Sequence, residues 1–552
     1  IQDRGLRGLD CALCHLADMD EDARGLARVG HRDHATVGFD RAGVPDLTAA
    51  FGVKRCLVQR DLNSVALLHL GHLRTVLDQR NDLPLGSFGV IAQKIGGAGI
   101  HNGALSSKTW WELSREAYAL GNHCKSTNVP APKHNFQILK TEVNKAVAKR
   151  RELLEHHMYN INLNAGKDLF HYKQGVAKVV GETIVMITGE DGEIEIEADN
   201  IILATGSRPR KLEHLPIDEK IVLTSDGIEN LEEFPKSMVI VGAGVIGCEF
   251  ATIFSNFGQT KVHMIDKGDR ILPFEDEDVV GIVEQNLESK DVLIHRNSKL
   301  IDMKIDNGMV VYTLEYHNGT KEVFHVEKAL VSIGRIPNYE NLLSASVQID
   351  MDSRGIIDDM TQTSMKHIYA VGDITADIAL VNVGELEGRY AIEKIFGQPE
   401  KELIYENVST IMFLAPEVAG VGINEIKARE QNIPHKVVSL DYSCISRAIA
   451  MRNTEGFIKI IVSNDEEMRV LGMRVVGEHA SSSIEAVALL ISMSKGVEEL
   501  AELIHPHPSI IEGIQECVRM LLNKSMFKPG VLRDSMRCTS FENGQVSNTV
   551  FE

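Results

Sequence analysis

The pattern of apolar positions is most regular in the middle of the chain. Residues 238–242, MVIVG, form a short apolar run that predicts a buried strand. Apolar side chains then recur at helical spacing through residues 248–257, which predicts a helix with one buried face. A second apolar run at residues 261–265, KVHMI, predicts another strand. A strand, a helix and a second strand in this order are typical of an α/β fold with a parallel sheet.

The segments before and after this central unit also show patterns that predict helices and strands. Residues 139–157 predict a charged amphipathic helix whose basic stretch is a solvated face. Residues 409–530 alternate strand-like and helical patterns, and the polar residues from Arg533 onward predict a flexible tail. At roughly 100–200 residues per domain, the 552 residues correspond to about three to five domains.

The first 90 residues differ from the rest of the chain. Their apolar residues stand in short irregular clusters that predict no strand–turn–helix unit, and regular periodicity begins only near Ile95. Residues 1–90 hold ten Arg and one Lys, whereas residues 91–552 hold 18 Arg and 29 Lys. Nothing in the physical chemistry of Arg and Lys requires their ratio to change at a domain border. Two explanations stay open: a divergent or appended segment, and a segment translated from a wrong reading frame or a mis-joined exon.

Charge and cysteine content exclude several functions. The 58 basic and 78 acidic residues give a formal charge of −20, which disfavours nucleic-acid binding. No apolar run is long enough for a membrane span, and eight cysteines indicate a reducing compartment rather than a disulfide framework. The C-x-x-C of Cys11 and Cys14 has no second pair at metal-site spacing, so we predict no metal. Ile1 suggests a processed or truncated start without a secretory signal, and the cytosol and the mitochondrion both remain open.

The central strand–helix–strand segment carries a dinucleotide-binding fingerprint. Gly242 allows a tight turn, Gly244 lets the backbone approach a pyrophosphate, and Gly247 lets the helix pack closely on the strand. The helix N-terminus offers free N–H groups to the phosphates. Asp266 follows Gly247 by 19 residues, where a carboxylate accepts hydrogen bonds from a ribose and repels a 2′-phosphate. The sequence therefore predicts NAD(H) in preference to NADP(H), a preference that the neighbouring Lys267 weakens.

Four further motifs carry a family resemblance. They are IILATGSRP at residues 201–209, SIGRIPN at 332–338, IYAVGD at 368–373 and HPSIIE at 507–512. In order and spacing they resemble the class I pyridine nucleotide–disulfide oxidoreductases, in particular the dihydrolipoamide dehydrogenase and soluble pyridine nucleotide transhydrogenase branches. The resemblance covers about residues 95–530. It implies a homodimer that binds FAD and NAD, with the NAD domain inserted in the FAD domain and a C-terminal α+β dimerisation domain.

The resemblance also implies domain borders and site residues. The expected segments are an atypical N-terminal segment (1–90), the FAD-binding domain (91–215 and 346–408), the NAD-binding domain (216–345), an interface domain (409–532) and a flexible tail (533–552). The implied catalytic residues are Lys108 near the flavin, its partner Glu249, and the acid–base pair His507 and Glu512. The implied cofactor-binding residues are Lys108, Gly175, Thr205, Gly206, Ser207, Gly242, Gly244, Gly247, Asp266, Gly334, Asp373, Ala379, Leu380, Val381 and Asn382.

The chain departs from the family pattern in two places. The family's redox motif is G-G-T-C-x-N-x-G-C-x-P-x-K, and residues 96–108 read GGAGIHNGALSSK. Gly99 and Ala104 therefore stand where the family has its two redox cysteines, and no sulfur is present to accept electrons from a flavin. In addition, residues 1–90 contain no GxGxxG for the FAD pyrophosphate. Either this sequence does not record the fingerprint, or the chain binds FAD poorly.

These departures define the functional hypotheses. The first is an FAD-dependent NAD(P)H oxidoreductase of transhydrogenase or diaphorase type, which passes electrons to a second nicotinamide or a quinone-like acceptor without a redox disulfide. The second is a dihydrolipoyl dehydrogenase-like protein that serves as a non-catalytic scaffold subunit. The third is a dihydrolipoyl dehydrogenase that uses a remote cysteine pair. The sequence does not identify the electron acceptor, and without a dithiol substrate His507 and Glu512 have no evident proton to transfer.

Overall fold

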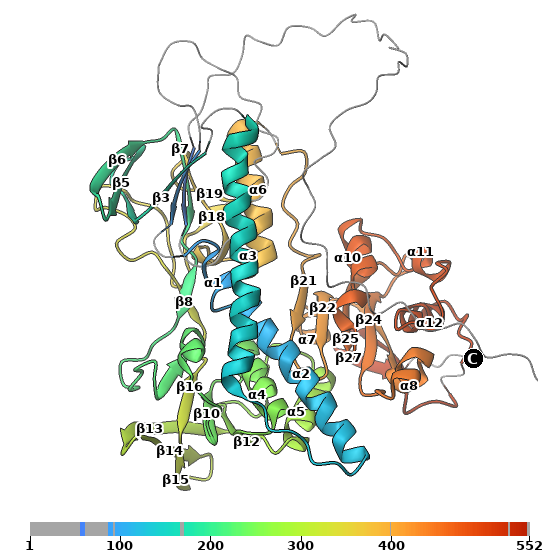
Figure 1. Cartoon of the computed structure of the whole chain (residues 1–552). Helices are drawn as coiled ribbons and strands as arrows, with labels where there is room; N and C mark the ends of the chain where they lie inside the picture. The colour runs from blue at the N-terminus through green and yellow to red at the C-terminus, as the bar shows by residue number, and fades with distance from the viewer. Residues whose placement is uncertain are drawn as a thin grey trace, which may run out of the picture. The chain divides into compact units, whose positions relative to one another are not determined.

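The computed structural model describes residues 56–60, 87–91, 94–165, 170–397, 399–527 and 530–548. All of them belong to one unit of the chain, Val53–Glu552. The Cys11 and Cys14 pair and most of the atypical N-terminal segment lie outside the described residues. The described residues form an α/β protein with several separate sheets (Figure 1).

The first sheet joins segments that are far apart in the sequence. Its strand order is β18-β19-β20-β7-β1-β2-β3, and the strands from β20 to β3 run parallel. Its strands are β1 (Cys56–Arg60), β2 (Ser87–Ile91), β3 (Phe170–Gln174), β7 (Asn200–Ala204), β18 (Asp358–Asp359), β19 (Gln362–Thr363) and β20 (Ile368–Ala370). Every side chain of β7 is buried, as expected for an apolar run at the centre of a parallel sheet.

Strand β1 and most of β2 lie in the segment for which the sequence pattern predicts no strand–turn–helix unit. Each has five residues, and β1 pairs with β2 on one side and with β7 on the other. Such short segments carry little periodic signal, because their strand conformation comes from pairing with distant parts of the chain.

A small antiparallel sheet follows the first part of this domain. It consists of β4 (Val176–Val179), β5 (Ile184–Gly189) and β6 (Gly192–Glu197). The helices of the domain are α1 (Gly97–Ile100), α2 (Ala104–Ser126), α3 (Phe136–Ala165) and α6 (Val381–Phe396). Helix α3 contains the charged amphipathic segment predicted from the sequence.

The predicted strand–helix–strand unit is confirmed as β10 (Ser237–Val241), α4 (Val245–Phe257) and β11 (Lys261–Ile265). It belongs to a five-stranded parallel sheet with the order β12-β11-β10-β16-β9. The other strands are β9 (Val222–Thr224), β12 (Leu293–His295) and β16 (Lys328–Val331), and helix α5 spans Glu277–Ser289. An antiparallel sheet of β13 (Ser298–Asp306), β14 (Met309–Tyr316) and β15 (Lys321–Val326) completes this domain.

Aromatic packing joins the two nucleotide-binding regions. Trp110 of α2 stacks on Phe136 of α3 with ring centroids 5.0 Å apart, and meets Phe257 of α4 edge-on at 6.3 Å. These side chains are nearly fully buried. The packing therefore fixes the start of α2, which follows the loop 96–103, against the helix that carries the dinucleotide fingerprint.

The C-terminal domain is a seven-stranded antiparallel sheet with helices. Its strand order is β21-β22-β25-β24-β23-β26-β27. The strands are β21 (Ser409–Met412), β22 (Val418–Gly422), β23 (His435–Asp441), β24 (Phe457–Ser463), β25 (Val470–Val476), β26 (Met536–Glu542) and β27 (Gln545–Asn548). The helices are α7 (Glu425–Glu430), α8 (Ser446–Met451), α9 (Ala480–Ser483), α10 (Glu485–Ser492), α11 (Glu498–Ala501) and α12 (Glu512–Leu521).

The prediction of a flexible tail from residue 533 is wrong for residues 536–548. Strand β26 pairs with β23 and β27 pairs with β26. Met536, Cys538, Thr539 and Phe541 are buried, so most of β26 is covered by the domain core without a regular alternation. The polar residues dominate the composition of the segment, and it carries no clear strand period in the sequence.

The remaining elements are short. They are β8 (Ser207–Pro209), β17 (Arg335–Pro337), and the 3₁₀ helices η2 (Ser225–Asn230), η3 (Gly372–Ile374) and η4 (Tyr442–Cys444). Within the described ranges, no helix combines the length and the apolar character needed to cross a lipid bilayer.

Candidate active site

Residues 96–103, which include the short helix α1 and are called the loop below, carry no cysteine and have a backbone that depends on glycine. Gly96 and Gly97 have positive φ angles of 89° and 54°, which favour glycine. A Cβ on Gly103 would lie 2.4 Å from the carbonyl oxygen of Ala98, so a side chain does not fit there. Gly99 is buried and Ala104, the first residue of α2, is partly exposed. The backbone of this turn therefore depends on its glycines, and Gly99 and Ala104, which the resemblance aligns with the family's redox cysteines, carry no sulfur.

Lys108 and Glu249 lie together at the junction of three regions. Lys108 Nζ of α2 is 2.9 Å from Glu249 Oε2 of α4, and the Phe413 backbone N–H donates to Glu249 Oε1 over 3.1 Å. The ammonium group also lies 4.9 Å from the centre of the Phe413 ring. Glu249 is 5% exposed, while the Lys108 side chain is 28% exposed. The carboxylate thus holds one lysine in a fixed place and leaves part of it accessible.

The residues of the dinucleotide fingerprint fit an NAD molecule. Gly242 has a φ angle of 103°, and a Cβ on Gly247 would lie 2.0 Å from the Gly242 carbonyl oxygen. A Cβ on Gly244 would meet no described atom within 4 Å, so this side of the turn is open for a pyrophosphate. Asp266 directly follows β11 and accepts hydrogen bonds from Ala243 N at 3.0 Å and Gly268 N at 2.8 Å. Its carboxylate therefore lies beside the glycine turn.

The residues expected to bind FAD gather at the carboxyl ends of β7 and β20, which are adjacent parallel strands. Thr205 Oγ1 donates to the Asn338 carbonyl oxygen over 2.6 Å, and Asn338 Nδ2 donates back to the Thr205 carbonyl oxygen over 3.0 Å. Ser207 Oγ donates to Asp373 Oδ2 over 2.6 Å. Ligands of open α/β sheets bind at this edge, so the donor and acceptor set fits a dinucleotide cofactor.

Glu387 is a buried acid that the sequence analysis missed. It lies on α6, accepts the Gly372 N–H over 2.6 Å and the Tyr405 hydroxyl over 3.0 Å, and is 1% exposed. Burial raises its pKa to about 7, against the hydrogen bonds that lower it. The carboxyl fixes the turn just before Asp373. A single glutamate within a helix gives no sequence signal of this role.

The other expected cofactor residues lie at backbone turns and at the start of a helix. Gly175 joins β3 to β4, where a Cβ would lie 2.8 Å from the Thr188 carbonyl oxygen. Gly334 has a φ angle of 100°, and its carbonyl oxygen accepts the Arg210 N–H over 2.9 Å. Residues 379–382 lead into α6, whose N-cap is Leu380. The structure gives these positions a backbone role and does not test their contact with a cofactor.

His507 and Glu512 form a pair in the C-terminal domain. His507 Nδ1 lies 2.8 Å from Glu512 Oε1, and Ser509 N–H donates to Glu512 Oε2 over 2.8 Å. Burial alone would raise the pKa of Glu512, but the hydrogen bonds from Ser509 and His507 hold it below its usual value. The His507 side chain is 70% exposed. The imidazole is therefore oriented by a carboxylate and open to a partner.

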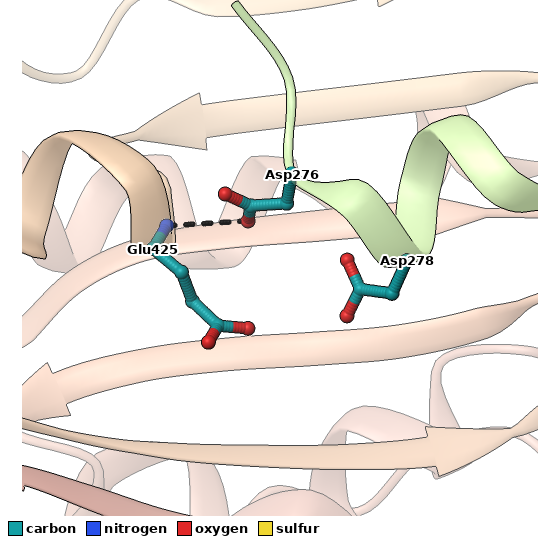
Figure 2. A group of neighbouring side chains, drawn as sticks. All are labelled: Asp276, Asp278 and Glu425. Atoms are coloured by element: carbon teal, nitrogen blue, oxygen red, sulfur yellow. Dashed lines mark hydrogen bonds between the residues drawn. The ribbon is translucent and has the colours of Figure 1, made fainter. Parts of the chain in front are cut away.

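A group of three carboxylates lies elsewhere, between α5 and the C-terminal domain (Figure 2). Asp276, Asp278 and Glu425 place oxygens within 4.8 Å of one another. Lys459 Nζ lies 2.7 Å from Asp276 and Asp278 and 2.9 Å from Glu425, and Arg537 also pairs with Asp278 and Glu425. Burial alone would lower the pKa of Lys459, but the three carboxylates raise it. The buried lysine occupies the position between the carboxylates, so this group is a structural ion-pair network.

The domains and their site residues have counterparts in known proteins. A family model described as pyridine nucleotide-disulphide oxidoreductase matches residues 112–388, and the model of that family's dimerisation domain matches residues 408–518. The dihydrolipoyl dehydrogenase of Bacillus subtilis is 30% identical over 443 residues, which cover 77% of this chain and 90% of that protein. The dihydrolipoyl dehydrogenase of Chlamydia muridarum is 33% identical over 359 residues, which cover 64% and 75%.

Solved structures show the same fold. LpdA from Mycobacterium tuberculosis has a TM-score of 0.75 at 23% identity, with 84% of this chain and 99% of that chain covered. The HOCl-induced flavoprotein disulfide reductase RclA from Escherichia coli has a TM-score of 0.70 at 22% identity, with 84% and 99% covered.

Fold, site and comparisons together define an α/β oxidoreductase with two dinucleotide-binding domains and a dimerisation domain. The chain belongs to the class I pyridine nucleotide–disulfide oxidoreductase family, whose cofactors are FAD and NAD(H).

Proposed function

We propose that this protein oxidises NADH with FAD as cofactor and passes the electrons to an acceptor other than a disulfide, as a transhydrogenase or a diaphorase does. The observation that carries the proposal is the loop 96–103. Its glycine-dependent backbone is intact, but Gly99 and Ala104 replace both redox cysteines. Without a thiol at either position, the loop cannot pass electrons to a dithiol substrate through its own sulfur.

The surroundings of the remaining cysteines support this proposal. Among the cysteines whose side chains the structure describes, the free ones are Cys124, Cys248, Cys444, Cys517 and Cys538. Cys248 precedes Glu249 in the chain, but its Sγ lies 3.5 Å from the Ala243 carbonyl oxygen inside the helix packing. Burial raises its pKa far above the usual range, which suppresses the reactive thiolate.

The two cysteines of the C-terminal domain core are equally unsuited. Cys517 on α12 and Cys538 on β26 both belong to the hydrophobic core of that domain. Burial raises the pKa of Cys517 well above its usual value. A redox role would require both thiols to leave this core.

In the proposed reaction the chain's own residues bind and orient. The turn at Gly242, Gly244 and Gly247 would hold the NAD pyrophosphate, with Asp266 at the adenosine ribose. Asp373 and Thr205 would hold FAD, which supplies a ring that takes up a hydride. The Lys108 ammonium, fixed by Glu249, would stabilise negative charge at the site.

The proposed assembly is a homodimer, which the matched dimerisation domain supports. His507 is exposed on this domain and already oriented by Glu512, so its imidazole is free to contact a second subunit. We propose that the pair takes part in the partner's site or in the dimer contact.

One observation favours a second candidate, a dihydrolipoyl dehydrogenase-like protein. The relatives reported above are dihydrolipoyl dehydrogenases, and the His507–Glu512 pair is intact at 2.8 Å. Such a protein would be either a non-catalytic scaffold subunit or an enzyme with a remote cysteine pair.

The purified protein separates these candidates. We expect flavin absorbance, NADH-dependent reduction of 2,6-dichlorophenolindophenol or thio-NAD⁺, and no oxidation of dihydrolipoamide. A colourless dimer without any of these activities supports the scaffold, and dihydrolipoamide turnover supports the remote pair. The G99C/A104C double variant, with the single variants as controls, tests whether sulfur in this loop is all that dithiol chemistry lacks.

A further inference from the structure

A cavity with mixed polar and apolar walls lies next to the loop and opens between α2, α3, η2 and α4. Its polar lining includes His101, Asn102, Ser106, Ser107, Lys140 and Glu229, and its apolar lining consists of Trp110, Val143, Ile228 and Phe250. It has room for about two water molecules. Asn102 Oδ1 is buried and has no hydrogen-bond partner among the described residues, so it can accept a hydrogen bond from a water there. This combination of space and polar groups is what ordered water requires.

His101 offers a base to this cavity. Its Nε2 lies 2.9 Å from the Ile95 carbonyl oxygen, which only accepts hydrogen bonds. Nε2 therefore carries the proton, and in the neutral ring Nδ1 has a free lone pair. Burial lowers the pKa of His101, and Lys94 and Arg151 lower it further against the Ile95 hydrogen bond and Glu229, which favours the neutral ring. In the family motif the corresponding residue is Asn, which cannot exchange a proton in this way.

Ser107 connects this cavity with Lys108. The hydroxyl lines the cavity and lies 3.3 Å from Lys108 Nζ, while it donates to the Gly103 carbonyl oxygen over 2.8 Å. The Lys108 ammonium is thus one hydroxyl away from a water-sized space that also contains His101. If Lys108 gives up a proton, the Ser107 hydroxyl can pass it another one from the cavity.

The choice of acceptor decides whether such a path is needed. A hydride from NADH brings two electrons and one proton, and a quinone that becomes a hydroquinone gains two electrons and two protons. Each turnover therefore takes one proton from solvent. Transfer of a hydride from NADH to a second nicotinamide breaks one C–H bond and forms another, and takes up no proton. Only the first reaction requires a proton path to the site.

We propose that His101 relays a solvent proton through the cavity and Ser107 to Lys108 when the protein reduces a quinone-like acceptor. The inference rests on the proposed function, and it adds a proton-coupled acceptor class to it. His101 acts through Ser107 and Lys108 and is not itself a catalytic residue. Among the described residues, the charged groups that line the cavity, shift the pKa of His101 or pair with Lys108 are Lys94, Lys108, Lys140, Arg151, Glu229 and Glu249.

The test compares two acceptors in one variant. His101→Gln places an amide N–H near the position of Nε2, where it can donate to the Ile95 carbonyl oxygen, but removes the titrating base. With NADH as donor, we expect kcat for menadione to fall at least about tenfold, with an increased solvent deuterium isotope effect. Transfer to thio-NAD⁺ should stay within about twofold, because it takes up no proton. Added imidazole should restore menadione reduction in His101→Ala. Asn144→Ala, which also alters the cavity lining, is the matched control.

Each other outcome is decisive. Equal losses with both acceptors mean that His101 only supports the loop, and unchanged rates with both mean that it relays nothing. If the unmodified protein reduces thio-NAD⁺ but no quinone or dye, the relay is refuted and the transhydrogenase stands. If it reduces neither, the proposed function itself fails.

Discussion

Two lysines form ion pairs between regions of this molecule, and their surroundings differ. Lys459 is fully buried and shared by three carboxylates, whereas Lys108 is partly exposed and pairs with one carboxylate. Glu249 also accepts the Phe413 N–H, just as Asp276 accepts the Glu425 and Ile426 N–H groups. The Lys459 network therefore connects the NAD domain with the C-terminal domain, whereas the Lys108–Glu249 pair connects α2 of the FAD domain with the NAD domain, and Glu249 also bonds the C-terminal domain through Phe413. Only Lys108 retains accessible surface with which it can serve a reaction.

Loss of the buried lysine should have the largest effect. Lys459→Met leaves three carboxylates without their shared cation, and breaking a buried pair costs about 3–5 kcal/mol. We expect that decrease in the free energy of unfolding, measured by urea denaturation of the flavin-loaded dimer. Lys495→Met, at an exposed lysine, is the control and should change it by less than about 0.5 kcal/mol. A stable Lys459→Met protein would show that the network contributes little.

Lys108→Met, in contrast to Lys459→Met, should lower the activity far more than the stability. The NADH-dependent reduction of acceptors should fall about 100-fold, as expected when a positioned charge is removed from an active site. Stability should fall less than in Lys459→Met, because Lys108 is partly exposed and the buried Glu249 keeps the Phe413 N–H. Steady-state kinetics and urea denaturation on the same preparation measure both quantities. Full activity with a large stability loss would make Lys108 a structural residue like Lys459.

Glu387 should make stability depend on pH. Its folded pKa of about 7 lies above the ordinary value of 4.5, so the folded state binds more protons than the unfolded state between these values. The contribution of this group is therefore present at low pH and is lost as the pH rises through 7. Glu387→Gln should remove this decline. Urea denaturation at a series of pH values measures the free energy of unfolding of the unmodified protein and of Glu387→Gln. If the two proteins lose stability in parallel as the pH rises, Glu387 is not the group responsible.

The smallest effect concerns the choice of nicotinamide nucleotide. Asp266→Asn removes the charge that repels a 2′-phosphate and keeps an oxygen for one of the two N–H groups, Ala243 and Gly268, that bind separate oxygens of the carboxylate. We expect kcat/KM for NADPH to rise about tenfold relative to NADH, as for a change of about 1.4 kcal/mol. Asp269→Asn, three residues further on and exposed, is the control. An unchanged ratio would mean that Asp266 only shapes the turn.

The sequence predicts the dinucleotide unit well because its signal is local. Gly242, Gly247 and Asp266 fall within one strand–helix–strand segment, and the structure confirms those three elements. The pairing of Lys108 with Glu249 was expected only from the family resemblance, since no spacing rule links two helices so far apart in the chain.

The remaining features depend on contacts that no local pattern encodes. Strands β1 and β26 are ordered by distant partners, β7 and β23. The network around Lys459 combines side chains from α5, α7, β24 and β26. Each of these residues alone reads as an ordinary surface charge. Their burial follows from how the domains meet, which the sequence alone does not reveal.

The central claim is that electrons enter this protein but do not reach a disulfide. Titration of all thiols in denaturant, before and after anaerobic reduction with NADH, tests it directly. Because Gly99 and Ala104 carry no sulfur, we predict the same number of thiols in both samples, with at most the eight that the sequence contains. A gain of two thiols on reduction would reveal a redox disulfide and contradict the account.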